Sequence, residues 1–271
     1  MGIIKLDDID LSKLEKTKIQ GTKSTIYKQD DVCIKILDKL YPEEKQKLYR
    51  KLLEMDGIRL NNAILPIDLI VNNGSLEGYT MEYFKDSINI LDYFFRNRFV
   101  NCKDIFDVVK RASIILREIH SSGIICQDLS FENILIDING NIKYSDLDGC
   151  CYKEYMSPFI SYLLKYFLID YRKEQYIIPS ENLDRISFML SFFAAVYFKE
   201  IQNLSKKKYN ELSSKIRTLE NVKTYANMLV NKDLKLPIVP YLDELIDSFD
   251  DYIIDRNKQV SFKDKILRRV L

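Results

Sequence analysis

The chain reads Cys126-Gln127-Asp128-Leu129-Ser130-Phe131-Glu132-Asn133-Ile134-Leu135-Ile136, continues from Asp137 to Lys143 through Asn139-Gly140, and then reads Ser145-Asp146-Leu147-Asp148-Gly149. An aspartate is thus followed five residues later by an asparagine, after which an apolar run begins. Asn-Gly between two such runs is a strong hairpin signal. The pattern predicts a polar loop, a β-hairpin and, directly after the hairpin, a second acidic residue.

These side chains match the needs of phosphoryl transfer, which is catalysed mainly by positioning and charge neutralisation. Asp128 is expected to accept or orient the proton of an acceptor hydroxyl. Asn133 and Asp146 are expected to hold Mg2+ against the phosphates of ATP, because magnesium prefers hard oxygen ligands. Each acid alone has the simpler explanation of an exposed loop residue. The combination, together with Lys35 upstream, favours the catalytic interpretation.

On these residues the chain resembles the protein-kinase-like superfamily, and in detail the bacterial eukaryotic-like kinases. The resemblance runs from about Leu14 to Phe198. It implies an α+β, two-lobed fold. Residues 1–84 would form an N-terminal lobe with a small antiparallel β-sheet and the C helix, and residues 85–271 a larger, mainly helical C-terminal lobe. It also implies ATP and Mg2+ as cofactors.

Two β-branched segments, Thr25 to Lys28 and Val32 to Leu37, predict strands joined by a tight turn. The resemblance places Lys35 on the second strand as the lysine that binds the α and β phosphates. An exposed lysine on an alternating strand is the alternative. Gly21 is the one glycine kept from the phosphate-covering loop, and it permits close approach of the backbone to phosphate; a plain turn explains it equally well.

Residues 42–55 predict the C helix, with a proline near its start and an apolar face. Its ion-pair glutamate is either Glu44, which lies near the apolar face and is preferred, or Glu54, which has the more usual distance from Lys35 in sequence. Strands are expected at 63–71 and 78–84, separated by a hairpin turn. The second strand resembles the kinase hinge, where backbone groups of Glu82 and Phe84 would bind adenine.

A helix over 104–120 is expected to lead into the catalytic loop, and His120 at its end is interpreted as a structural residue that bonds to nearby backbone. Asp184 begins a second apolar helix. The resemblance makes it the acid that accepts backbone N–H bonds from the catalytic loop, whereas a helix N-cap is the alternative. Residues 255–262 faintly resemble the last kinase helices.

Three departures limit the resemblance. Gln127 stands where kinases have the arginine that receives an activation-loop phosphate, so control by such phosphorylation is not expected. Ser130 replaces a lysine, which leaves the acceptor class open. Asp148 replaces the glycine of D-F-G, and the segment from Cys150 to Ile178, rich in Tyr, Phe and Lys, is expected to face substrate or to inhibit the enzyme.

Composition is consistent with one domain that has a sizeable core, since 46% of the 271 residues are apolar. The net charge of +1 predicts no nucleic-acid partner. Apolar runs reach about a dozen residues, short of the ~20 that span a membrane. Without a signal-peptide pattern at the start, the expected location is the cytoplasm. Five cysteines without metal-ligand spacing predict reduced thiols.

The sequence therefore predicts an ATP- and Mg2+-dependent phosphotransferase that acts on protein hydroxyls, with Ser and Thr favoured. Two alternatives stay open: a kinase-fold binding module with impaired catalysis, and a small-molecule kinase. Retention of Lys35, Asp128, Asn133 and Asp146 argues against the first alternative. A protein substrate is the expected partner, and the oligomeric state is left open.

Overall fold

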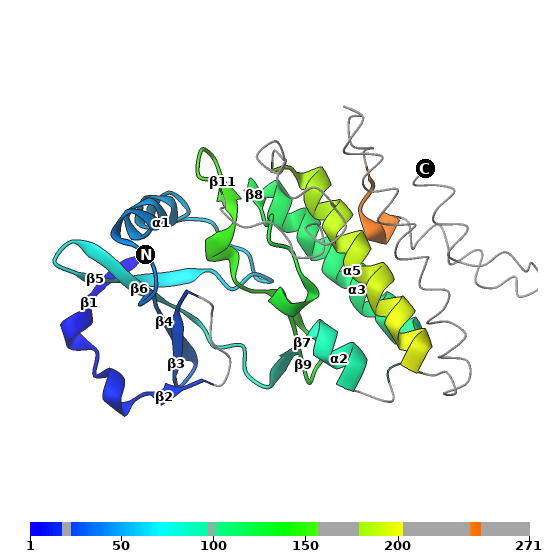
Figure 1. The fold of residues 1–271 in the computed structure, drawn as a ribbon, viewed down its shortest axis with the longest axis horizontal. Coiled ribbons are helices and arrows are strands. Elements are labelled where there is room, and N and C mark those ends of the chain that lie inside the picture. Colours follow the sequence, from blue (N-terminus) through cyan, green and yellow to red (C-terminus); the bar gives the residue numbers. More distant parts are fainter. Residues whose placement is uncertain (18–22, 97–99, 101, 157–178, 203–238, 245–271) are drawn as a thin grey trace, which may run out of the picture.

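The structure is a computed structural model that describes residues 1–17, 23–96, 100, 102–156, 179–202 and 239–244 (Figure 1). Several predicted features lie outside these ranges: Gly21, most of the segment that ends at Ile178, and the helices predicted near the C-terminus.

A six-stranded sheet forms the N-terminal part, in the order β1-β5-β6-β4-β3-β2. Its strands are β1 (Gly2–Lys5), β2 (Glu15–Lys16), β3 (Thr25–Gln29), β4 (Val32–Ile36), β5 (Pro66–Asn72) and β6 (Ser75–Glu82). Two short 3-10 helices, η1 (Leu6–Asp8) and η2 (Leu11–Lys13), connect β1 to β2. The two predicted hairpins are confirmed as β3–β4 and β5–β6.

The sheet is mixed, whereas the sequence predicts an antiparallel one. Strand β1 runs parallel to β5, with Gly2 opposite Asp68 and Ile4 opposite Ile70. A parallel pair needs a long connection between its strands, and here β2, β3, β4 and helix α1 (Pro42–Glu54) lie between them in the chain. The local pattern of β1 does not reveal so distant a partner.

Helix α1 is confirmed within one residue of its predicted end. Pro42 occupies the first helical position, where a missing N–H costs nothing, and the Glu44 carboxylate accepts a bond from the Tyr41 N–H at 2.9 Å. Leu52 and Met55 on its apolar face are buried. The helix lies against strand β6 of the sheet.

The second part of the described chain is mainly helical and carries two small sheets (Figure 1). Strands β7, β9 and β10 form one sheet, and β8 pairs with β11 in the other. In Figure 1 the long helices α3 and α5 lie side by side, and they are in contact. The elements are β7 (Ser87–Asn89), α2 (Ile90–Arg96), α3 (Cys102–Ser121), β8 (Ile124–Ile125), η3 (Phe131–Asn133), β9 (Ile134–Asp137), β10 (Ile142–Tyr144), η4 (Leu147–Gly149), β11 (Cys151–Tyr152) and α5 (Glu181–Gln202).

One continuous hydrophobic core joins the two parts. It includes Leu37 and Leu52 from the side of the sheet and of α1, and Ile119 and Phe188 from the helices. The apolar residues of α3 recur with the period of a helix, so that one face of α3 packs into this core. No helix in the described part of the chain is long and apolar enough to cross a membrane.

Candidate active site

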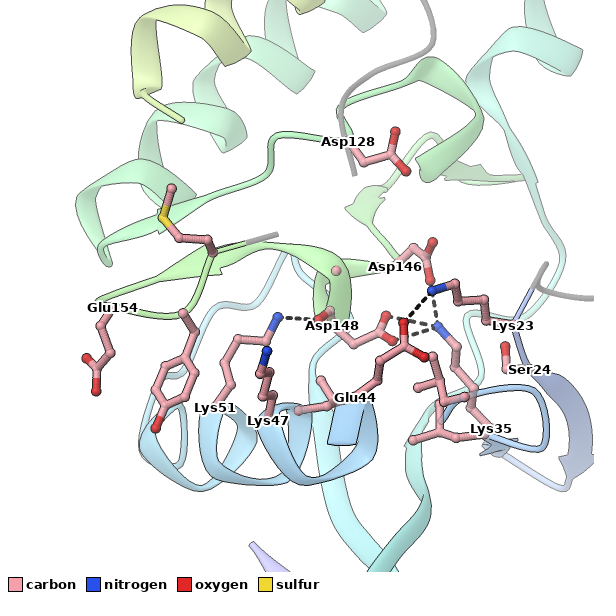
Figure 2. A pocket seen from close by; sticks show the side chains of 16 residues that line it. Lys23, Ser24, Lys35, Glu44, Lys47, Lys51, Asp128, Asp146, Asp148 and Glu154 are labelled. Carbon is pink, nitrogen blue, oxygen red and sulfur yellow. Dashed lines mark hydrogen bonds and ion pairs between the residues drawn. The ribbon is translucent and has the colours of Figure 1, made fainter. Parts of the chain in front are cut away.

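A cleft of about 820 Å³ opens between α1, the β3–β4 hairpin and the turn after β10. Lys35, Asp128, Asp146 and Asp148 line it, and Figure 2 shows Asp146 and Asp148 between Asp128 and Lys35. The fold thus brings four predicted site residues, Lys35, Glu44, Asp128 and Asp146, to one cleft, although Lys35 and Asp146 are 111 residues apart in sequence.

Lys35 is buried in this cleft, with a side chain that is 8% exposed. Its Nζ donates to Asp146 Oδ1 at 2.6 Å and to the two carboxylate oxygens of Asp148 at 2.9 and 3.0 Å. Burial alone would lower the pKa of Lys35, but Asp148, followed by Tyr79 and Asp146, holds it well above its ordinary value. Lys35 is therefore a charged, paired residue of the cleft, and the alternative of an exposed strand lysine is wrong.

The two acids after β10 have different environments. Burial by itself would raise the pKa of Asp148, but the Lys35 ammonium lowers it below the ordinary value. Desolvation and the neighbouring Asp148 carboxylate raise the pKa of Asp146. The side chain of Asp146 is 53% exposed and that of Asp148 is 13% exposed. Asp146 is thus the more open acid, and Asp148 is the buried partner of Lys35.

The backbone is left-handed directly before Asp128 and at Asp146 itself. Gln127 precedes Asp128 and has a φ of 55°, and Asp146 has a φ of 60° and a ψ of 32°. Such a conformation is costly for a residue other than glycine and persists where the surrounding structure enforces it, often at functional sites. A hydrogen bond within the loop also links Asp128 to Asn133, because Asn133 Nδ2 donates to the Asp128 carbonyl at 3.1 Å.

Asp184 anchors the loop that leads to Asp128. Its Oδ2 accepts the Cys126 N–H at 2.6 Å, and its Oδ1 accepts the Gln127 N–H at 2.8 Å. The N-cap alternative is wrong, since the Ser180 hydroxyl accepts the N–H of Leu183 at the start of α5. Asp184 is fully buried, so these bonds compensate for the desolvation of its carboxylate.

His120 is structural, as predicted, but its partners are side chains rather than backbone groups. Nε2 lies 3.0 Å from Asp184 Oδ2, and Nδ1 lies 2.8 Å from the hydroxyl of Tyr241. The Asp184 carboxylate accepts from Nε2–H, while Nδ1 shares a hydrogen bond with the Tyr241 hydroxyl. A chain of hydrogen bonds therefore runs from Tyr241 to the backbone beside Asp128.

Gln127, at the position of the missing arginine, is buried and accepts a hydrogen bond from Cys151 Sγ at 2.7 Å. Strand β11 also pairs with β8, with Cys151 opposite Ile125. The start of the predicted insert, at Cys151, is thus bonded to the loop that leads to Asp128 by contacts between protein groups. Cys33, Cys126, Cys150 and Cys151 are buried thiols rather than disulfides.

Neither candidate glutamate of α1 pairs with Lys35, which corrects the preference for Glu44. Glu44 Oε1 accepts from Lys23 Nζ at 2.7 Å. Glu54 Oε2 accepts from Lys153 Nζ at 2.9 Å and its Oε1 from the Tyr155 hydroxyl at 3.0 Å. Both glutamates bond to segments that the helical pattern of α1 could not reveal.

Glu82 and Phe84 do not line this cleft. The Glu82 carboxylate accepts from Lys143 Nζ at 2.5 Å, the same ammonium lies 5.4 Å from the Phe84 ring, and the Phe84 carbonyl accepts from the Ser87 hydroxyl at 2.6 Å. Lys143 thus links the β9–β10 hairpin to the end of β6. The adenine role of these residues stays a prediction, and so does the role of Gly21.

Sequence reasoning missed two residues, Asp148 and Lys51. Lys51 is buried on α1, and its Nζ donates to the Asp148 carbonyl and, at 2.8 Å, to the Cys150 carbonyl. A signal was present, because Lys51 falls between Leu48 and Leu52 on the apolar face of the helix. A lysine on such a face requires a buried partner. The signal for Asp148 was weaker: an acidic residue stands where protein kinases have the glycine of D-F-G.

Asp146 supplies the cleft with a half-exposed carboxylate, a donor that suits a magnesium ion. Asn133, the other predicted metal ligand, does not line the cleft, but its amide nitrogen donates to the carbonyl of Asp128, which does. Mg2+ prefers such ligands and keeps several water or phosphate oxygens. Within the described residues, no group of three or more His, Cys, Asp or Glu side chains can hold a metal ion.

The comparison with curated proteins gives partial matches to protein kinases, among them the following three. The chain is 28% identical over 138 residues to the serine/threonine-protein kinase STE20 of Debaryomyces hansenii. This match covers 48% of this chain and 12% of the relative. It is 29% identical over 109 residues to the NUAK family SNF1-like kinase 2 of Rattus norvegicus. This match covers 40% of this chain and 17% of the relative.

The third relative is the serine/threonine-protein kinase STE20 of Kluyveromyces lactis, 28% identical over 151 residues, or 52% of this chain and 15% of the relative. No protein-family model matches the chain. In each case the match spans less than a fifth of the relative's length. The matches support a protein-kinase-like relationship and, at the coarse level, a phosphotransferase.

Proposed function

We propose that the chain is an ATP- and Mg2+-dependent protein kinase that phosphorylates protein hydroxyls, with Ser and Thr favoured. One observation carries the proposal: the buried ammonium of Lys35 contacts Asp146 in a cleft that Asp128 also lines. The partial similarity to serine/threonine-protein kinases supports the same activity. The proposal includes the bacterial eukaryotic-like type of kinase that the sequence resembles. It also includes two lobes, at 1–84 and 85–271, and a cytoplasmic site of action.

The proposal assigns roles to three residues of the cleft and to two residues near it. Lys35 binds phosphate oxygens through its ammonium, and Asp146 and Asn133 supply oxygen ligands for the metal. Bound Mg2+ would neutralise charge on the transferring phosphoryl group. Asp128 orients the acceptor hydroxyl and accepts its proton, and Asp184 holds the backbone just before Asp128 in place. Rigid placement of this kind is the main source of catalysis in phosphoryl transfer.

A kinase-fold binding module with impaired catalysis is the second candidate. The observation in its favour is the 2.6 Å ion pair between Lys35 and Asp146, in which the phosphate-binding cation neutralises the metal-binding acid. An active enzyme must open this pair when nucleotide and metal bind, whereas a binding module can keep it closed.

Transfer from labelled ATP separates the candidates. Purified protein is incubated with cell extract and Mg2+, and the labelled products are identified by mass spectrometry. Wild type is expected to label protein Ser or Thr. Asp128→Asn is expected to keep nucleotide affinity and to lose roughly 10²- to 10⁴-fold in turnover, the usual scale for a positioned proton acceptor.

Glu132→Gln is the matched control, because Glu132 is an exposed acid on η3 in the same loop. It should leave turnover unchanged. Label on a metabolite alone would favour a small-molecule kinase. Nucleotide binding without any transfer would favour the impaired binding module.

A further inference from the structure

No acid of helix α1 pairs with Lys35, although Glu44 lines the same cleft. Glu43 is exposed, Glu44 bonds to Lys23, and Glu54 bonds to Lys153 and Tyr155. These three are the acidic residues within α1. The helix that packs beside Lys35 therefore contributes no carboxylate to it.

The carboxylate that Lys35 contacts with both oxygens comes from the turn η4. Asp148 Oδ1 and Oδ2 lie 2.9 and 3.0 Å from Nζ, and both side chains are largely buried. A charged hydrogen bond with two acceptor oxygens restricts the direction of the ammonium as well as its position. The more exposed Asp146 contacts the same ammonium through one oxygen.

Helix α1 is attached to the same turn by a cation. Lys51 Nζ donates to the carbonyls of Asp148 and Cys150, and its side chain is buried. Figure 2 shows Lys51 extending from α1 toward Asp148. Lys35 therefore donates to the side-chain carboxylate of Asp148, and Lys51 donates to backbone carbonyls of the same turn.

We propose that Asp148 is the positioning residue for Lys35, and that α1 supports this arrangement through Lys51 rather than through a glutamate. That Asp148 contributes to nucleotide binding through Lys35 rests on the proposed function. The coupling between Lys35 and Asp148 does not depend on that function. Asp148 is two residues from Asp146, so a single turn sets both the phosphate-binding lysine and the metal-binding acid.

A double-mutant cycle tests the coupling without reference to activity. Urea unfolding is measured for wild type, Lys35→Met, Asp148→Asn and the double variant. Asp148→Asn is expected to lower the ratio of folded to unfolded protein in the wild-type background. Beside Lys35→Met it should leave the ratio unchanged or raise it, because it then removes a buried carboxylate that has lost its cation. The expected non-additivity is about tenfold in that ratio, within the range for contacting residues.

The rival cycles replace Asp148→Asn by Glu44→Gln or Glu54→Gln and are expected to be additive. Additive behaviour of Lys35 and Asp148, or equal coupling of Lys35 to either glutamate, would overturn the proposal. If Asp148→Asn fails to fold, the double variant should still fold, because the lysine that needs the carboxylate is gone. Failure of both variants would make Asp148 merely structural and contradict the inference.

Binding of a fluorescent ADP with Mg2+ tests the functional consequence. Asp148→Asn is expected to weaken binding by roughly tenfold or more, as loss of a charged hydrogen bond does. Glu43→Gln is the control and should leave affinity unchanged. A loss at Glu54→Gln equal to that at Asp148→Asn would contradict the inference. If wild type binds no nucleotide while the cycle is coupled, the proposed function fails and the positioning of Lys35 by Asp148 stands.

Discussion

At the scale of single residues, the cleft contains a buried cation between two unequal acids. A buried charge is tolerated only when it is paired and hydrogen-bonded. Asp148 provides this to Lys35 with two oxygens, and its lowered pKa reflects the same attraction. Asp146 is held beside another carboxylate, in left-handed backbone, with a raised pKa. The two acids of one turn should therefore have opposite effects on stability.

We expect Asp146→Asn to leave the free energy of unfolding of the nucleotide-free protein unchanged or higher at neutral pH. The substitution removes repulsion between Asp146 and Asp148, and the amide oxygen can still accept from Lys35. Asp148→Asn should lower it by about 1–3 kcal/mol, because a buried charged bond is lost. Urea unfolding of both variants checks this. Destabilisation by Asp146→Asn as large as that by Asp148→Asn would contradict it.

Cys150 links stability to alkaline pH. Burial raises its pKa from 9.0 to about 12. The pKa of a cysteine in the unfolded chain is about 8.5. Since the folded pKa is the higher one, the stabilisation is fully present below pH ~8.5 and is lost as pH rises toward 12, by about 1.4 kcal/mol per pH unit.

Cys150→Ala should reduce this slope between about pH 8.5 and 10, the range in which the unfolded thiol ionises. The free energy of unfolding is measured in urea at several pH values, and slopes are compared, because the substitution also changes packing. Cys126, whose pKa burial also raises, leaves a residual slope in the variant. Identical slopes in wild type and variant would refute the link.

At the scale of elements, the described segment from Val239 to Glu244 closes a network with α3 and α5. Asp243 accepts from the Ser113 hydroxyl at 2.8 Å and from Arg117 at 2.6 Å, and Tyr241 bonds to His120. Through Asp184, the network continues to the backbone beside Asp128. A segment far along the chain thus helps to fix the loop that contains Asp128.

Tyr241→Phe should cost about 1–3 kcal/mol of stability, because the buried Nδ1 of His120 loses its partner. If the network positions the loop, turnover should fall more than nucleotide affinity. Thermal unfolding, turnover and nucleotide affinity are measured together. Tyr41→Phe, which removes an exposed hydroxyl, is the control. A loss of stability with unchanged turnover would limit Tyr241 to a structural role.

At the scale of the whole molecule, a single core joins the sheet and the helices, and the cleft lies where they meet. Lys35 comes from the sheet, Lys51 from α1, and the acids from the loops beside the helices. A ligand that binds Lys35 and Asp146 together contacts both parts. Nucleotide binding should therefore stabilise the entire fold.

We expect Mg2+ and ATP to stabilise the protein by linkage, by about 2.7 kcal/mol at one hundred times Kd. Asp146→Ala should remove most of the metal-dependent part. The measurement is the shift in Tm with ATP and Mg2+ against the shift with ATP and a chelator. Equal shifts in wild type would contradict the metal site.

The sequence by itself determined the local elements. The β3–β4 hairpin, the start of α1 at Pro42, and the β9–β10 hairpin with its Asn139-Gly140 turn depend on periodicity and turn chemistry over a few residues. The resemblance carried by these segments predicted Lys35, Asp128 and Asp146 as site residues, and the structure brings all three to one cleft.

Only the tertiary structure decided which of these residues touch. Asp148 rather than Glu44 pairs with Lys35, Asp184 anchors a loop instead of capping a helix, and β1 runs parallel to β5. Lys35 and Asp148 are 113 residues apart in the chain. Local patterns carry no information on such pairs, because the packing of distant elements, and the need of each buried charge for a partner, select them.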